Sequence, residues 1–115
     1  MNIENSKAQL RKGILGFCVL ALLRSEEAYP SDLLSSLKDA KLIVMEGTLH
    51  PLLSRLKNAG LLTYRWEESK SGPPRKYYSL TDQGQTFYTE LSESWGALRD
   101  AVELLLKDIK PNHTK

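Results

Sequence analysis

Cysteine is almost absent from this chain of 115 residues, and the usual catalytic groupings are missing as well. Cys18 is the only cysteine, so an intrachain disulfide is excluded, and its apolar surroundings in "ILGFCVLALL" indicate a small core residue. Neither His50 nor His113 has a Cys, Asp or Glu at the spacing of a metal site or a catalytic triad. The sequence therefore predicts no enzyme, no metal site and no cofactor, in a protein of the cytoplasm.

Long hydrophobic runs and a strong excess of charge are lacking too. The apolar run Ile14 to Leu23 has ten residues, whereas a helix that spans a bilayer needs about 20, and no signal-peptide cleavage pattern follows it. We expect a buried helix there and no membrane partner. Sixteen Lys and Arg residues against fourteen Asp and Glu give a net charge of +2, which permits a nucleic-acid partner without requiring one.

Apolar residues recur at helical spacing in four segments. They predict helices over residues 7–24, 30–40, 46–59 and 82–110, the last capped by Thr81 and stopped by Pro111. Pro51 costs little in a first turn, so we expect it to fix the start of the third helix near Gly47 or Thr48, and Gly60 to end that helix. The first few residues and the tail "PNHTK" are expected to be loose.

Two segments between the third and fourth helices alternate in polarity and are rich in aromatic residues. "LLTYRWEES" and "RKYYSLT" predict two strands, with Leu62, Tyr64 and Trp66 on one face. We expect "KSGPP" to form the connecting loop, because its prolines cannot continue the ladder of hydrogen bonds. The predicted fold is mainly α with a β-hairpin, in the order α-α-α-β-β-α.

The third predicted helix has one apolar and one polar face. Leu49, Leu52, Leu53 and Leu56 follow the spacing of a buried stripe. The opposite face carries short or basic side chains that suit a DNA groove: Thr48, His50, Ser54 and Arg55. Two helices followed by such a third helix form a helix-turn-helix, whose second helix enters the major groove of double-stranded DNA.

The hairpin would add a wing to this helix-turn-helix. Lys70, Arg75 and Lys76 lie at or near its predicted tip, where each cation could neutralise a phosphate, and the Tyr77 hydroxyl could add a hydrogen bond. Other interpretations remain open at this stage. A polar helix face is often only solvated, His50 alone makes a poor metal site, and basic tips keep strand edges soluble. The alternative function is a winged-helix module that binds proteins and no DNA.

The last predicted helix carries an apolar seam with spacings of 4, 3, 4, 3 and 4 residues, which is typical of a heptad pattern. The seam consists of Leu91, Trp95, Leu98, Val102, Leu105 and Ile109. It predicts a helix that pairs with another helix.

Two motifs resemble a known family. "EGTLHPLLSRLKNAGLL" resembles the "GTLYPLLxRLExxGLL" signature of PadR-like transcriptional regulators, and "SGPPRKYYSLTDQG" is similar to their wing and the start of their C-terminal helix. The resemblance implies a winged helix-turn-helix homodimer that binds promoter DNA through the helix and wing residues named above. His50 stands where the family usually has Tyr, and "YPSDL" replaces the common "YGYEI", so base preference and backbone contacts are in question.

The single terminal helix resembles a small PadR subfamily, some of whose members bind flat aromatic drugs between paired tryptophans. Trp95 occupies the corresponding position, so it either lines a pocket for a small aromatic or hydrophobic effector or only packs at the dimer centre. We interpret the chain as a dimeric repressor of an inverted-repeat operator. The expected units are a DNA-binding domain (1–80), a dimerisation helix (81–110) and a flexible tail (111–115).

Overall fold

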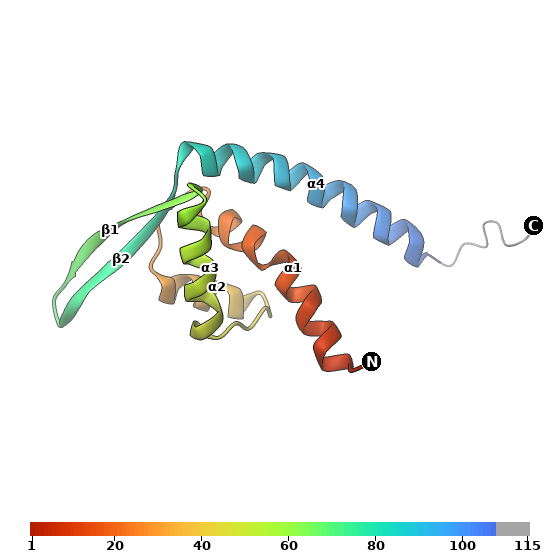
Figure 1. The fold of residues 1–115 in the computed structure, drawn as a ribbon, viewed down its shortest axis with the longest axis horizontal. Helices are drawn as coiled ribbons and strands as arrows, with labels where there is room; N and C mark the ends of the chain where they lie inside the picture. The colour runs from red at the N-terminus through yellow and green to blue at the C-terminus, as the bar shows by residue number, and fades with distance from the viewer. Residues whose placement is uncertain (108–115) are drawn as a thin grey trace, which may run out of the picture.

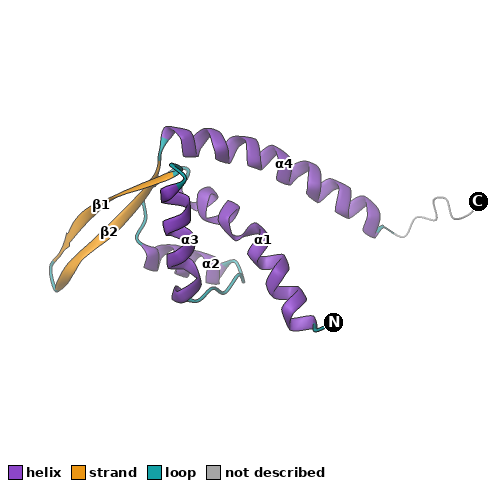
Figure 2. Ribbon diagram, in the orientation of Figure 1, coloured by secondary structure: helices purple, strands orange, loops and turns teal. Residues whose placement is uncertain are grey.

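The computed structural model describes residues 1–107, which form a helical body with two projections (Figures 1 and 2). The elements are α1 (Ile3–Leu23), α2 (Pro30–Asp39), α3 (Glu46–Asn58), β1 (Leu62–Ser69), β2 (Gly72–Leu80) and α4 (Asp82–Leu106). This order confirms the predicted winged-helix fold. Figure 1 shows the hairpin extending from one side of the body and α4 from the other.

The core lies between the first three helices and the base of the hairpin. Its fully buried side chains are Val19, Leu20, Leu33, Leu49 and Leu53. The link between α1 and α2 is tied to the sheet, because the Ala28 amide donates to the Tyr78 carbonyl at 3.0 Å and the Tyr78 amide donates back at 2.8 Å. Cys18, predicted to be a core residue, is half-buried and packs against the outside of this core.

Helix α1 begins earlier than the sequence pattern indicated. The Asn2 side chain accepts hydrogen bonds from the amides of Glu4, at 2.8 Å, and Asn5, at 3.2 Å. Asparagine at this position satisfies amides that have no acceptor within the helix. The expectation of loose first residues was therefore wrong, since the polar segment before Lys7 has its own helix cap.

Helix α3 begins at Glu46, after Met45, whose carbonyl accepts from the amides of Thr48 and Leu49. Pro51 lies in the second turn and does not fix the start of the helix, so that expectation was wrong. A proline here removes only the one hydrogen bond to the carbonyl four residues earlier, and the buried leucines hold the helix across this gap. Gly60 ends the helix with φ +85°, as predicted.

The paired strands extend closer to the tip of the hairpin than the sequence predicted. The register runs from Leu62 opposite Leu80 to Ser69 opposite Gly72, with an irregularity beyond Glu67. The connection is therefore Lys70 and Ser71 only, and both prolines of "KSGPP" lie within β2. An isolated hairpin has no third strand that needs their amides, and the irregular register leaves extra residues of β2 unpaired.

Helix α4 is capped by Thr81, whose hydroxyl oxygen accepts from the Gly84 amide at 2.9 Å, as predicted. It ends at Leu106, several residues before the expected end at Lys110. Leu105 and Leu106 are exposed, so the last turn gains little from packing. Residues 108–115, which include the seam residue Ile109 and the tail, lie outside the described part of the chain.

Candidate nucleic-acid interface

Helix α3 presents its polar face to solvent and its leucines to the core, as the sequence predicted. Leu49 and Leu53 are fully buried, and Leu52 is buried beside them. All four candidate DNA-contact residues of this helix are exposed: Thr48, His50, Ser54 and Arg55. The Thr48 amide already donates to Met45, so the helix geometry leaves the amides of Glu46 and Gly47 for an outside acceptor.

The four residues lie on two flanks of α3. His50 and Ser54 face the hairpin across a cleft of about 460 Å³. We call it the α3–wing cleft; its lining includes His50, Ser54, Trp66, Arg75, Lys76 and Tyr29. It brings residues of α2, β1 and β2 together beside the exposed face of α3.

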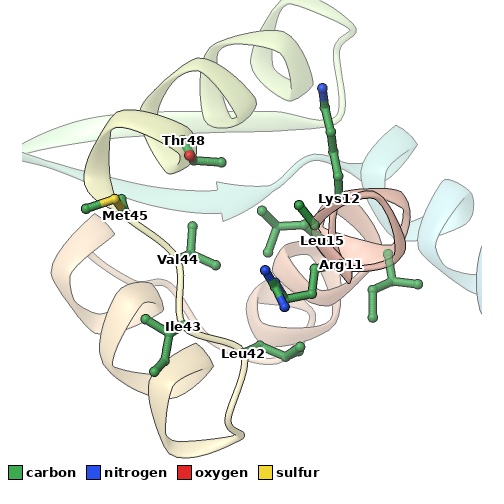
Figure 3. Close-up of a pocket in the computed structure, with 10 residues that line it drawn as sticks. Arg11, Lys12, Leu15, Leu42, Ile43, Val44, Met45 and Thr48 are labelled. Carbon is green, nitrogen blue, oxygen red and sulfur yellow. The ribbon is translucent and has the colours of Figure 1, made fainter. Parts of the chain in front are cut away.

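Thr48 and Arg55 lie on the flank that faces α1. Figure 3 shows Thr48 on the first turn of α3, on the side of Leu15 and Lys12, at a pocket of about 320 Å³. Arg55 lines a different cavity, described below. The four predicted residues therefore lie on the exposed part of α3, two of them beside the hairpin and two beside α1.

The predicted cations of the wing do not gather at its tip. Only Lys70 lies in the turn, whereas Arg75 and Lys76 lie several residues along β2. Because side chains alternate along a strand, these two project to opposite faces of the hairpin. Lys76 shares the face of Tyr64 and Trp66, with its amine 4.6 Å and 5.6 Å from their ring centroids.

Arg75 lies on the other face and is held by the N-terminus of α2. Its guanidinium lies 3.9 Å from the ring centroid of Tyr29, and that ring lies 4.6 Å from the ring of Tyr77. The Tyr29 amide donates to the Asp32 carboxylate at 3.0 Å, which fixes the backbone at the start of α2. Tyr77 therefore packs within an aromatic and cationic group rather than standing free beside the tip.

Arg65 shares this face but is neutralised within the chain. It forms an ion pair with Glu27 at 3.1 Å and a second with Glu67, and its guanidinium lies 4.8 Å from the Tyr77 ring centroid. The hydrogen bond that Arg65 donates to the Glu27 carboxylate raises the pKa of its guanidinium. Arg65 is thus less suited to a phosphate than Arg75, which forms no ion pair with any residue of 1–107.

The end of α3 and the start of α4 meet at a tight joint. The Thr81 hydroxyl donates to the Gly60 carbonyl at 2.6 Å while its oxygen accepts from Gly84. The Leu61 carbonyl accepts from the Thr81 amide at 3.1 Å, and a Cβ atom at Gly84 would lie 2.0 Å from that carbonyl oxygen. Only glycine fits at this position, so α4 is joined directly to the end of α3.

Beyond this joint α4 leaves the body, and its apolar seam becomes exposed. Leu91 is half-buried, and Trp95 is 37% exposed, whereas Leu98 reaches 58% and Leu105 reaches 82%. Val102 is exposed as well. The described seam residues therefore find little cover in their own chain.

Trp95 lines a cavity of about 410 Å³ between α1, α3 and α4. Phe17 of α1 also lines it, and its ring lies 6.4 Å from the ring of Trp95 and 5.6 Å from that of Tyr88. The only charged side chains of the lining are Lys12 and Arg55. A ligand in this cavity would touch α3 through Leu52, Arg55 and Leu56.

Other kinds of site find little support in the described chain. Within residues 1–107, no three His, Cys, Asp or Glu side chains come together as a metal site requires. Burial raises the pKa of the Cys18 thiol, which favours its unreactive neutral form. No helix of the described part is both long and apolar enough to cross a bilayer.

Sequence reasoning missed three residues of this region. Tyr29 and Trp66 lie in the α3–wing cleft, and Gly84 forms the joint to α4. Trp66 was predicted only to share a strand face with Leu62 and Tyr64, and it is 60% exposed. A glycine in the first turn of a predicted helix was an available signal for close packing, whereas the pairing of Tyr29 with Arg75 depends on contacts distant in sequence.

Comparisons with known proteins agree with this geometry. The profile of the transcriptional regulator PadR-like family matches residues 19–90, which include α2, α3 and the hairpin. A PadR-like transcription factor from Bacteroides fragilis is 54% identical, with 88% of this chain and 98% of that chain covered and a TM-score of 0.75. A PadR family regulator from Eggerthella lenta is 37% identical, with coverages of 93% and 94% and a TM-score of 0.82. A PadR-like regulator from Bacillus cereus is 35% identical, with coverages of 88% and 99% and a TM-score of 0.78.

Proposed function

Because the chain belongs to the PadR-like family of transcriptional regulators, we propose that it is a homodimeric repressor that binds an inverted-repeat operator in the cytoplasm. Family membership makes it a DNA-binding regulator and not an enzyme, in agreement with the sequence prediction. The observation that best supports the proposed mode is the α3–wing cleft, where an exposed helix face meets two cations on a hairpin.

In this proposal α3 enters the major groove. His50 and Ser54 approach base edges from the wing side, while Thr48 and Arg55 contact the groove or its phosphates from the α1 side. On the hairpin, Lys70, Arg75, Lys76 and Tyr77 act on the sugar-phosphate backbone. Residues 1–80 would thus form the DNA-binding unit.

The dimer is proposed to form along α4. The described seam residues are apolar and largely exposed, and burying a large aliphatic side chain contributes about 1.5–3 kcal/mol. On a two-fold axis the same surface meets itself, so the seams of two copies would cover each other. The two α3 helices would then meet half-sites one or more helical turns apart, roughly 34 Å per turn.

The cavity beside Trp95 is the proposed site of a small aromatic or hydrophobic effector. Such a ligand changes operator affinity only if it prefers one arrangement of the dimer. Two contacts supply a route for this linkage: Arg55 lines the cavity from the recognition helix, and Thr81 joins α3 to α4.

Gel shifts with the DNA upstream of the protein's own coding region test the central proposal. We expect a discrete complex whose affinity falls steeply as salt rises, because phosphate contacts release counterions. The same length of unrelated duplex is the control and should bind more weakly. A flat salt response would instead favour the winged helix as a protein-binding module.

Tryptophan fluorescence tests the effector site separately. Planar dyes of both charges, cationic and anionic, are titrated into the wild-type protein and the Trp95→Phe variant. A ligand in the cavity should quench the wild-type emission more strongly than the variant's. Equal quenching of both proteins would leave Trp95 as dimer packing only.

A further inference from the structure

Trp66 is far more exposed than the other large side chains on its face of strand β1. On the same face of β1, Leu62 is buried and Tyr64 is half-buried in contact with the core, but Trp66 is 60% exposed. Large aromatic side chains are mostly buried in folded chains, so an exposed one calls for an explanation. Figure 2 shows that the outer part of the hairpin continues beyond the helices.

The surroundings of Trp66 form a surface of mixed character. Its ring meets the ring of Tyr64 edge-on at 5.8 Å, and the Lys76 amine lies 5.6 Å from its centroid. It lines the α3–wing cleft together with His50 and Pro74. Pro73 and Pro74 also border it on a second hollow.

This surface fits one side of a nucleic-acid backbone. Sugar carbons present an apolar edge between charged phosphates, so a protein can contact both with one apolar group and one cation placed side by side. Trp66 and Pro74 supply the apolar group, and Lys76 supplies the cation. The cleft that holds them opens beside His50 and Ser54, the face proposed to enter the groove.

We propose that Trp66 is a DNA-contacting residue that packs, together with Pro74, against the deoxyribose edge of duplex DNA lying in the α3–wing cleft, while Lys76 contacts the adjacent phosphate. This inference rests on the proposed function. It assigns to the cleft a contact that does not depend on charge, beside the ionic contacts of the wing. In this proposal the Trp66 ring is exposed in the free protein and becomes covered when DNA binds.

The contact has a distinctive salt signature. An apolar contact releases no condensed counterions, so its loss lowers affinity without changing the slope of affinity against salt. Loss of Lys76 should reduce that slope by about one unit. A residue that only supports the shape of the hairpin would weaken the ionic contacts as well, and would change the slope.

Binding of the wild-type protein, Trp66→Ala, Trp66→Phe and Lys76→Ala to the upstream duplex is measured over a salt series. Trp66→Ala should weaken binding about tenfold at every salt concentration, and Trp66→Phe should restore most of the affinity because it keeps an apolar ring. Lys76→Ala should lower the slope. Wild-type affinity in Trp66→Ala, or a reduced slope, would overturn the inference.

A spectroscopic measurement avoids dependence on variants. The wild-type protein is labelled with 5-fluorotryptophan, and Trp66→Phe serves only to assign the two ¹⁹F signals, since the chain has two tryptophans. Adding the duplex should shift the Trp66 signal and remove its solvent isotope shift as the ring leaves water. An unchanged Trp66 signal in a formed complex would overturn this inference alone, whereas failure of the wild-type protein to bind any duplex would overturn the proposed function with it.

Discussion

The hairpin and α4 both project from the same helical body, yet they expose opposite kinds of surface. On the hairpin, each of two cations lies over an aromatic ring, Arg75 over Tyr29 and Lys76 over Tyr64. On α4, Leu98 and Leu105 are exposed with little cover from the chain itself. We propose that this arrangement prepares the hairpin for a polyanion, and that a second apolar surface covers α4 in the dimer.

A contact of the kind seen on the hairpin contributes less free energy than burial of a side chain of the kind exposed on α4. A cation over an aromatic ring at an exposed site gains about 0.5–1 kcal/mol, which orients the side chain and leaves its charge available. An aliphatic side chain gains about 1.5–3 kcal/mol only when it is fully buried. We therefore expect changes on α4 to act on assembly with large effects, and changes on the hairpin to act on DNA affinity in smaller steps.

The largest effect is expected from Leu98→Glu. A carboxylate on a desolvated helix contact costs several kcal/mol, so the variant should sediment as a monomer and lose operator binding. Leu104→Glu is the matched control, because Leu104 is 57% exposed but lies off the seam. If Leu98→Glu remained dimeric, α4 would not carry the proposed interface.

Gly84→Ala should act on the joint between the two projections. The added Cβ would lie 2.0 Å from the Leu61 carbonyl oxygen, so we expect the free energy of unfolding to fall by about 1–3 kcal/mol or more. At Gly96, on the same helix, a Cβ meets nothing within 4 Å, and Gly96→Ala should stabilise by up to about 1 kcal/mol. Chemical denaturation compares the two, and equal stabilities would show that the joint is not tight.

Arg75→Ala tests whether the hairpin contributes to DNA affinity without contributing to assembly. Losing one phosphate contact should reduce the slope of log affinity against log salt by about one unit while the protein remains dimeric. Arg99→Ala is the control, since Arg99 lies on α4 beside Asp100 at 3.3 Å. Titrations at several salt concentrations measure both, and identical slopes would remove Arg75 from the backbone contact.

The smallest effect is expected from Glu46→Gln. Glu46 is the one acidic residue lining the α3–wing cleft, where its carboxylate would repel a phosphate. Removing the charge should strengthen operator binding about two- to fivefold, even though the helix start loses a favourable carboxylate. Glu103→Gln on α4 should leave the affinity unchanged. Weaker binding by Glu46→Gln would place the DNA away from this cleft.

The sequence predicted the parts of this molecule that depend on local pattern. The leucine spacing of α3, the left-handed Gly60 and the Thr81 cap are set by residues within a few positions of one another, and the structure confirms all three. The position of the apolar seam on α4 was likewise predicted from the spacing of its apolar residues. The family motifs supported the prediction of a winged-helix fold.

Prediction failed where packing overrides local preference. Pro51 sits one turn inside α3 because buried leucines offset a missing hydrogen bond, and Pro74 lies within β2 because the hairpin has no third strand. Placement of the site residues was only partly predictable. Arg75 is drawn from the tip toward Tyr29, a residue 46 positions away in the sequence, and no local pattern reports such a contact.

Hydrogen–deuterium exchange of the protein, with and without its proposed operator duplex, tests most directly whether the hairpin binds DNA while α4 mediates assembly. The account predicts slower amide exchange in the first turns of α3 and along the hairpin around Lys76 when DNA is added, with little change along the outer half of α4. Protection confined to α4, with the hairpin exchanging as in the free protein, would contradict it.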